Sequence, residues 1–200
     1  MNKNQALAAI SSGNKDLLRK VAIEKRKTLS FNFIQKSSKT ITEKLLSNFD
    51  FSNKRIHLFY PIKTKQEIYT WFIHKQLINQ NCKFYTSVHN TQKNSWDCIQ
   101  FDPNINFKET TFKVPVPVKY INSSYSQIDM IIIPLLAFDK DGNRIGYGKG
   151  IYDKIISNLK PNCIKIGVSF FENQNETIHS QIHDKKLDYC QTTNKLYKFI

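Results

Sequence analysis

The stretch Asp129-Met-Ile-Ile-Ile133 decides the fold class, because it is a near-continuous apolar run bounded by turn residues. Runs of this kind are typical of a central parallel strand that is covered on both faces. After it come a turn around Asp141-Gly142-Asn143, a cluster of glycines, and a helix pattern that reaches Leu159. A buried strand followed by a helix predicts one unit of an α/β protein.

The sequence on both sides of this stretch continues the alternation of strands and helices. Segments with apolar residues at helical spacing begin at Lys15 (with Asn14 as the candidate N-cap), Phe31 and Glu67, and the last two reach Asn48 and Asn79. Segments with strand composition cover residues 55–60, 83–88, 96–101, 112–118, 163–170 and part of 187–199. We therefore predict a three-layer αβα sandwich with a mainly parallel, Rossmann-like sheet.

Length and composition indicate one folded domain. Hydrophobic residues make up 40% of the 200 residues, which is enough for a buried core and excludes a disordered chain. A single core serves chains of up to about 250–300 residues, so we expect one domain over residues 1–200. The polar, Asn-rich residues 1–14 are expected to form a loose leader.

Membrane insertion and disulfide bonding are not expected. The longest apolar run, residues 130–138, is interrupted by Pro134, and a spanning helix needs about 20 residues. The four cysteines lie far apart, with no zinc-ligand spacing and no export signal, so we expect reduced thiols. The chain is accordingly expected to be cytoplasmic.

The net charge of +14 raises the question of a nucleic-acid partner. The basic residues are 26 Lys and only four Arg, and Asn is abundant at nineteen residues, so a general enrichment in Lys and Asn explains the composition. The densest basic stretch, residues 20–27, contains Glu24 and falls on a helix pattern with a solvated face. We expect small anionic ligands and no nucleic acid. The alternative is a basic RNA- or ribosome-associated binding protein without enzymatic activity, which would bind RNA tightly with a steep salt dependence.

The segment Asn143-Arg-Ile-Gly-Tyr-Gly-Lys-Gly-Ile-Tyr-Asp153 is the one that indicates chemistry. Its three alternate glycines allow close approach of a ligand, and a glycine loop before a helix presents free N–H groups to an anion. Lys149 and Arg144 add charge for phosphate oxygens. Asp153 suits either Mg²⁺ or compensation of the helix dipole. The spacing matches neither a Walker A motif nor a Rossmann fingerprint, so a plain strand-to-helix turn remains an alternative.

Five short motifs in order make the chain resemble the 5-formyltetrahydrofolate cyclo-ligase family, also called 5,10-methenyltetrahydrofolate synthetases. The motifs are Lys15-Asp-Leu-Leu-Arg19, the strand Ile56 to Tyr60 followed by Glu67-Ile-Tyr-Thr70, Pro134-Leu-Leu-Ala-Phe-Asp139, Arg144 through Asp153, and His183-Asp184 with Leu187-Asp188. The chain departs from the family pattern at Leu135, where Gly is usual, at Ile151, where Tyr is usual, and at His179, where Pro is usual. None of these departures removes a residue expected to do chemistry.

The resemblance implies an α/β enzyme that uses ATP and Mg²⁺ to convert 5-formyltetrahydrofolate into 5,10-methenyltetrahydrofolate, ADP and phosphate. The γ-phosphoryl group would pass to the formyl oxygen, and N10 of the same folate would attack, so proximity supplies much of the rate. By the same resemblance, Lys149 and Arg144 have catalytic roles. The implied ATP contacts are Lys15, Arg19, Arg144, Ile145, Gly146, Tyr147, Gly148, Lys149, Gly150, Ile151 and Tyr152.

The resemblance also implies a metal site and a folate pocket. Asp153 and Asp184 would ligate Mg²⁺, and Glu67 would accept hydrogen bonds from the pterin, with Tyr60 and Tyr152 in the same pocket. The expected partners are these small molecules alone, and the protein is expected to be a monomer. Because a fold does not fix a function, another phosphate-ligand enzyme on a similar α/β sheet remains an alternative.

Overall fold

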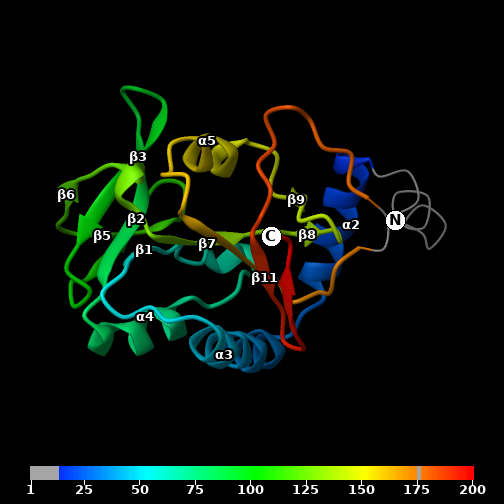
Figure 1. Cartoon of the computed structure of the whole chain (residues 1–200), viewed down its shortest axis with the longest axis horizontal. Helices are drawn as coiled ribbons and strands as arrows, with labels where there is room; N and C mark the ends of the chain where they lie inside the picture. The colour runs from blue at the N-terminus through cyan, green and yellow to red at the C-terminus, as the bar shows by residue number, and fades with distance from the viewer. Residues whose placement is uncertain (1–13, 175–176) are drawn as a thin grey trace.

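The computed structural model describes residues 14–174 and 177–200, which contain an eight-stranded central sheet (Figure 1). All of the predicted leader except Asn14 lies outside the described residues. Across the sheet the strands run β12 (Leu196–Lys198), β11 (Tyr189–Gln191), β10 (Ile164–Val168), β7 (Met130–Pro134), β1 (Arg55–His57), β2 (Lys83–Asn90), β3 (Ser95–Phe101) and β6 (Ile121–Asn122).

The centre of the sheet is parallel. Strand β1 pairs in parallel with β2 and β7, and β10 pairs in parallel with β7 and β11, whereas β12, β3 and β6 join antiparallel at the two sides. Residues 130–133 of β7 are at most 3% exposed, as a strand covered on both faces requires. The prediction of an α/β fold with a mainly parallel sheet is confirmed.

Helices cover both faces of the sheet. Helices α3 (Phe31–Asn48) and α4 (Trp71–Leu77) lie on one face, and α5 (Ile151–Ser157) lies on the other (Figure 1). On the first face, Ile41 of α3 belongs to the same core cluster as Ile56 and Ile132 of the strands. On the second face, Ile155 belongs to a cluster with Ile131 and Ile133, so the alternate residues of β7 serve the two layers.

Helix α2 (Lys15–Lys27) lies against a small hairpin formed by β8 (Ala137–Phe138) and β9 (Arg144–Ile145). The Asn14 side chain accepts hydrogen bonds from the backbone N–H groups of residues 16 and 17 at 3.0 and 3.2 Å, as predicted for the N-cap. Leu18 and Ala22 pack with Ala137 and Ile145 in a third core cluster. Along the chain, this hairpin connects the central strand β7 to the glycines at 146–150, and the sequence patterns did not predict it.

Three local predictions differ from the structure. The helix expected from Glu67 begins only at Trp71, because Gln66 adopts a left-handed conformation (φ 47°) and the Thr70 hydroxyl bonds to the carbonyl of Phe59. The strand expected at 112–118 is shorter than predicted: only β5 (Pro115–Pro117) is a strand, and it pairs with β4 (Phe107–Glu109) outside the central sheet. The tail forms two strands instead of one.

Three single-turn 3₁₀ helices complete the described elements. They are η1 (Lys63–Lys65), η2 (Ile78–Gln80) and η3 (Tyr125–Gln127). None of the helices in the described part of the chain has the length and apolar character that crossing a membrane requires.

Candidate functional site

Residues 146–150, which connect β9 to α5 and are called the glycine loop below, lie at the carboxyl ends of the parallel strands. This edge of an open α/β sheet is where ligands usually bind. None of the backbone N–H groups of residues 146–150 donates a hydrogen bond to an acceptor in the described residues. Loops with unpaired N–H groups can cradle an anion, so the geometry is compatible with an anion site and differs from a self-bonded turn.

Helix α2 reaches this loop through Arg19. The Arg19 Nε donates a hydrogen bond to the carbonyl of Gly146 at 2.9 Å, and its guanidinium also pairs with Asp16. Gly148 has a φ of +84°, and a Cβ built there would lie 3.0 Å from Arg19 Cζ. Glycine at 148 thus permits both the left-handed backbone and the close approach of the arginine.

Arg144 and Asp153 hold the backbone of Lys185, which is distant in the sequence, beside the loop. The Arg144 guanidinium, whose side chain is only 6% exposed, donates to Asp153 Oδ1 at 2.8 Å and also to the carbonyl of Lys185. Asp153 Oδ1 in turn accepts from the backbone N–H of Lys185 at 3.1 Å. Burial lowers the pKa of Arg144, although Asp153 and Asp184 oppose that shift. These bonds place Asp184 next to this site, although it is 31 residues from Asp153 in the sequence.

Asp184 is ion-paired with Lys15 at the start of α2. Burial opposes ionisation, but the N–H of Gln181 and the charge of Lys15 hold the pKa of Asp184 below its usual range. Both predicted metal ligands thus already have cationic partners. The structure brings together the predicted residues Lys15, Arg19, Arg144, Asp153 and Asp184, and all five lie beside the glycine loop.

In the described residues, no group of three or more His, Cys, Asp or Glu side chains is arranged to hold a metal ion. Mg²⁺ usually binds through one or two carboxylates together with waters and phosphate oxygens, because it loses its waters reluctantly. The pair Asp153 and Asp184 fits that donor set, provided that a phosphate ligand completes it.

Glu67 occupies a buried position between η1 and α4 and is 7% exposed. Its Oε2 accepts the backbone N–H of Ile62 at 2.8 Å. Burial raises the pKa of Glu67, against the effects of that N–H, Arg26, Lys65 and the Tyr147 hydroxyl. A buried carboxylate can accept hydrogen bonds from ring N–H and amino groups.

The remaining predicted residues occupy different environments. Lys149 is exposed, and its Nζ lies 5.8 Å from the centroid of the Phe112 ring. Tyr152 is packed against two of the core clusters, and burial, followed by the charge of Glu67, raises the pKa of its hydroxyl well above the usual value. Tyr60 is 3% exposed, and its hydroxyl bonds to His74 Nδ1 at 2.7 Å.

The side chains of the segment 145–151 face the protein interior or solvent to different degrees. Ile145 is 1% exposed, Ile151 is packed against the second core cluster, and Tyr147 is packed against the third. The side chains of these residues are therefore held by the fold, and the loop presents its backbone together with Lys149.

Two buried charged residues near the site were not singled out by sequence reasoning. Asp139 accepts four hydrogen bonds, from the N–H groups of residues 141, 143 and 178 and from the Asn143 side chain, and so shapes the turn before β9. Arg26 donates to the carbonyl of Leu135 at 2.6 Å and to the Tyr147 hydroxyl at 3.1 Å. Asp139 ends one of the quoted motifs, and Arg26 is one of only four arginines, so each carried a weak signal.

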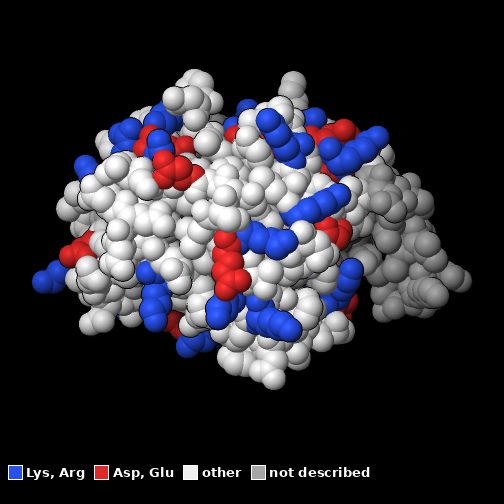
Figure 2. All heavy atoms as spheres, turned by 60° about the horizontal axis from the view of Figure 1, so that its bottom comes forward, with Lys and Arg blue, Asp and Glu red and all other residues white. Residues whose placement is uncertain are grey.

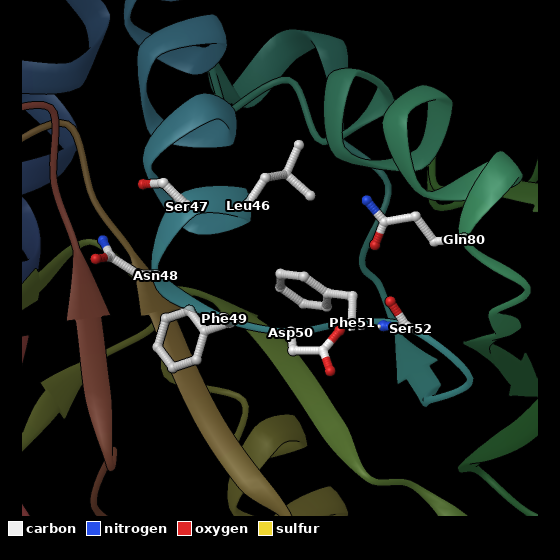
Figure 3. Close-up of a pocket in the computed structure, with 8 residues that line it drawn as sticks. All are labelled: Leu46, Ser47, Asn48, Phe49, Asp50, Phe51, Ser52 and Gln80. Atoms are coloured by element: carbon white, nitrogen blue, oxygen red, sulfur yellow. Dashed lines mark hydrogen bonds between the residues drawn. The ribbon is translucent and has the colours of Figure 1, made fainter.

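Two surface hollows in the described part of the chain lie away from the glycine loop. A hollow of about 530 Å³ lies at the opposite edge of the sheet, between the end of α3, residues 49–52 and Gln80 (Figure 3). A second hollow, of about 440 Å³, lies between the end of α5 and residues 185–188. On the face that carries α3 and α4, basic side chains are interspersed with uncharged surface and with Asp and Glu (Figure 2).

Comparisons with known proteins agree with this geometry. The model of the 5-formyltetrahydrofolate cyclo-ligase family matches residues 11–193. The 5-formyltetrahydrofolate cyclo-ligase of Mycoplasma pneumoniae is 32% identical over 161 residues, which are 78% of this chain and 85% of that protein. The cyclo-ligase of Mus musculus is 26% identical over 197 residues and 92% of each chain.

Solved structures share the fold. The 5,10-methenyltetrahydrofolate synthetase of Aquifex aeolicus has a TM-score of 0.78 at 23% identity and covers 92% of each chain. The corresponding synthetase of Mycoplasma pneumoniae has a TM-score of 0.70 at 25% identity, over 90% of this chain and 99% of that one. The likeness therefore extends over nearly the whole described chain.

Proposed function

The chain belongs to the 5-formyltetrahydrofolate cyclo-ligase family, and from this premise we propose that it converts 5-formyltetrahydrofolate into 5,10-methenyltetrahydrofolate with ATP. The observation that supports the proposal best is the glycine loop, residues 146–150. Its N–H groups lack acceptors in the described residues, it carries Lys149, and its Tyr147 is close to the buried carboxylate of Glu67. This arrangement offers an anion site next to an acceptor for ring N–H groups.

In the proposed reaction the formyl oxygen of the folate takes the γ-phosphoryl group of ATP, and ADP leaves. N10 of the same molecule then attacks the activated formyl carbon, loses its proton, and phosphate departs as the carbon–nitrogen ring closes. Because the attack is intramolecular, the protein has to align two ligands and neutralise charge rather than supply a nucleophile.

The basic residues around the loop would carry out the neutralisation. Lys149 is exposed and able to reach phosphate oxygens, whereas Arg144 would act by holding Asp153 and residue 185 in place. Lys15 is paired with Asp184, so it becomes available to phosphate only when Asp184 has another partner. Asp153 and Asp184 are the residues we propose to hold Mg²⁺, which when bound would neutralise charge on the transferred phosphoryl group.

Glu67 is the residue we propose to bind the pterin, with Tyr152 nearby. The carboxylate is buried, one of its oxygens accepts the N–H of Ile62, and the charge of Glu67 acts on the Tyr152 hydroxyl. For Tyr60, which is buried with its hydroxyl already bonded, we propose a role in the wall of the pocket.

We further propose a cytoplasmic monomer whose ligands are small anions and not nucleic acid. Four free cysteines in the described part of the chain suit a reducing compartment, and the mixed charges of Figure 2 suit small ligands. Size-exclusion chromatography with light scattering tests the monomer, and an RNA-binding titration at physiological salt tests the ligand class.

The activity has a direct test. The protein is mixed with Mg-ATP and fresh 5-formyltetrahydrofolate at neutral to mildly acidic pH, and near-ultraviolet absorbance of the methenyl product is followed. We expect product that depends on both ATP and folate, with one ADP released per methenyl group formed. A folded protein that forms no product under these conditions contradicts the proposal.

A further inference from the structure

Arg26, near the end of α2, is a buried cation to which the proposed reaction assigns no role. It is 4% exposed, and it is held by the carbonyl of Leu135 at 2.6 Å and by the Tyr147 hydroxyl at 3.1 Å. Removing a charge from water is costly unless the charge is paired and hydrogen-bonded. A surface position would have avoided that cost, so the buried location of Arg26 requires an explanation.

Tyr147 links this guanidinium to the glycine loop. It lies between Gly146 and Gly148, its ring is packed against the third core cluster, and Lys65 Nζ lies 3.9 Å from the ring centroid. Its hydroxyl accepts a hydrogen bond from Arg26, and the charge of the nearby Glu67 carboxylate, after burial, raises the pKa of the same hydroxyl. One side chain thus connects the loop proposed to hold ATP with the carboxylate proposed to hold the pterin.

Helix α2 is fastened to both regions. Near its first turn, Arg19 bonds to the carbonyl of Gly146 in the glycine loop. At its other end, the Gln66 side chain donates to the carbonyls of Lys27, the last residue of α2, and of Leu29 at 3.2 and 3.4 Å. Gln66 directly precedes Glu67, so the helix fixes the glycine loop and the Glu67 segment to one rigid element.

We propose that Arg26 is a positioning residue that joins the two substrate pockets by holding Tyr147, and with it the glycine loop, against Glu67. The inference rests on the proposed function, which takes the loop as the ATP site and Glu67 as the pterin acceptor. Loss of Arg26 then weakens both ATP and 5-formyltetrahydrofolate, whereas loss of a group that touches only one ligand weakens only that ligand.

The same arrangement predicts a change in pH dependence. The charged and titratable groups that face Glu67 are Arg26 from α2, Lys65 from η1, Tyr147 from the loop and Tyr152 from α5. Burial raises the pKa of Glu67, and Arg26 opposes the shift. Without Arg26 the carboxyl stays protonated up to a higher pH, so one of its oxygens becomes a hydrogen-bond donor, instead of an acceptor, at a higher pH than in the wild type.

The test uses the full chain, isothermal titration with ATP and with 5-formyltetrahydrofolate separately, and a pH profile of kcat/KM for the folate. Arg26→Met removes the charge and the fork, Arg26→Lys keeps the charge without the fork, and Tyr147→Phe removes one hydroxyl. Lys20→Met is the matched control, because Lys20 is an exposed residue of the same helix. Melting temperatures are recorded for all four variants.

We expect Arg26→Met to weaken both ligands about tenfold, since hydrogen bonds to charged groups contribute on this scale. In Arg26→Met, the acid limb of the kcat/KM profile moves to higher pH. In Arg26→Lys, that limb stays where it is in the wild type, but ATP still binds more weakly. Tyr147→Phe weakens both ligands a few-fold and decides the matter should Arg26→Met fail to fold.

Three results would overturn the inference: unchanged affinities in folded Arg26→Met, an equal loss in Lys20→Met, or a loss confined to one ligand. If the wild type forms no methenyl product but binds both ligands in an Arg26-dependent way, the proposed activity is contradicted and the positioning role is supported. If the wild type does not bind ATP, both the proposed activity and the positioning role are contradicted.

Discussion

Alanine substitution of the three glycines in the loop separates backbone strain from contact with Arg19. Gly146 has no positive φ, and a Cβ built there meets no heavy atom within 4 Å. Gly150 has a φ of +61° and is equally open, whereas Gly148 combines a φ of +84° with contacts of 3.0 to 3.3 Å to the Arg19 guanidinium. The series therefore adds one physical effect at each step.

The expected losses of stability follow from these differences. A left-handed conformation costs an L-residue about 1–2 kcal/mol, which is the expected loss in the free energy of unfolding for Gly150→Ala. Gly148→Ala adds the displacement of Arg19 from the Gly146 carbonyl, a bond worth about 0.5–1.5 kcal/mol. Gly146→Ala should stay within about 0.5 kcal/mol of the wild type. For a chain of this size each kcal/mol corresponds to about 2–4 °C in Tm.

Differential scanning calorimetry gives the order of the melting temperatures, and titration with Mg-ATP gives the second measurement. We expect Gly146→Ala to melt like the wild type yet bind ATP about tenfold more weakly, because its added methyl group occupies the space over the loop that phosphate oxygens would approach. If Gly146→Ala binds ATP normally, the loop is not the phosphate cradle. If Gly150→Ala melts lower than Gly148→Ala, the argument from Arg19 is wrong.

Three further predictions concern charged groups. Asp153→Asn should lower turnover more than 100-fold with a small change in Tm, because the partner of Arg144 stays in place but a carboxylate for Mg²⁺ is lost; normal melting with normal turnover would exclude the metal assignment. Lys149→Ala should raise KM for ATP about tenfold and leave Tm unchanged, as steady-state kinetics and calorimetry can establish, since its side chain is exposed. Burial opposes ionisation of Asp129, but Arg55 and Lys160 hold its pKa well below the usual range, so its stabilisation is present above the unfolded-state pKa and is lost as the pH falls. Urea unfolding of Asp129→Asn should therefore show a loss of about 2 kcal/mol at neutral pH that shrinks towards strongly acidic pH, and a constant difference would contradict this account.

The central strands were predictable because strands buried on both faces consist almost entirely of apolar residues. Residues 130–133 are apolar without interruption and bounded by turn residues, as is typical of a short strand covered on both faces. The helix expected from Glu67 failed for a tertiary reason. The spacing of the later apolar residues suits a helix, but Gln66 is left-handed and the side chains of Glu67 and Thr70 are bonded to the backbone of the preceding segment.

The sequence predicted those features of the candidate site that depend on residues close together in the chain. It did not predict the contacts between residues far apart in the chain. Lys15 and Arg19 are one helical turn apart, so sequence alone puts them on one side of a helix. Arg26 bonds to groups that lie 121 and 109 residues away, and no local pattern signals such contacts. Asp184 likewise comes beside Asp153 only through the bonds to the backbone of Lys185.

The balance of charge around the loop bears on how the two ligands of this site depend on each other. Three of the cations beside the loop, Lys15, Arg19 and Arg144, are already paired with carboxylates. The positive charge that remains available to a triphosphate therefore comes chiefly from Lys149, from Lys65 beside the Tyr147 ring, and from the loop N–H groups. Lys15 gains the freedom to contact phosphate only when Asp184 gains another cation, so nucleotide and divalent metal should bind as one unit rather than independently. If Asp153 and Asp184 hold Mg²⁺ as proposed, the pairing of these carboxylates would make the site selective for a metal–nucleotide complex over either component alone.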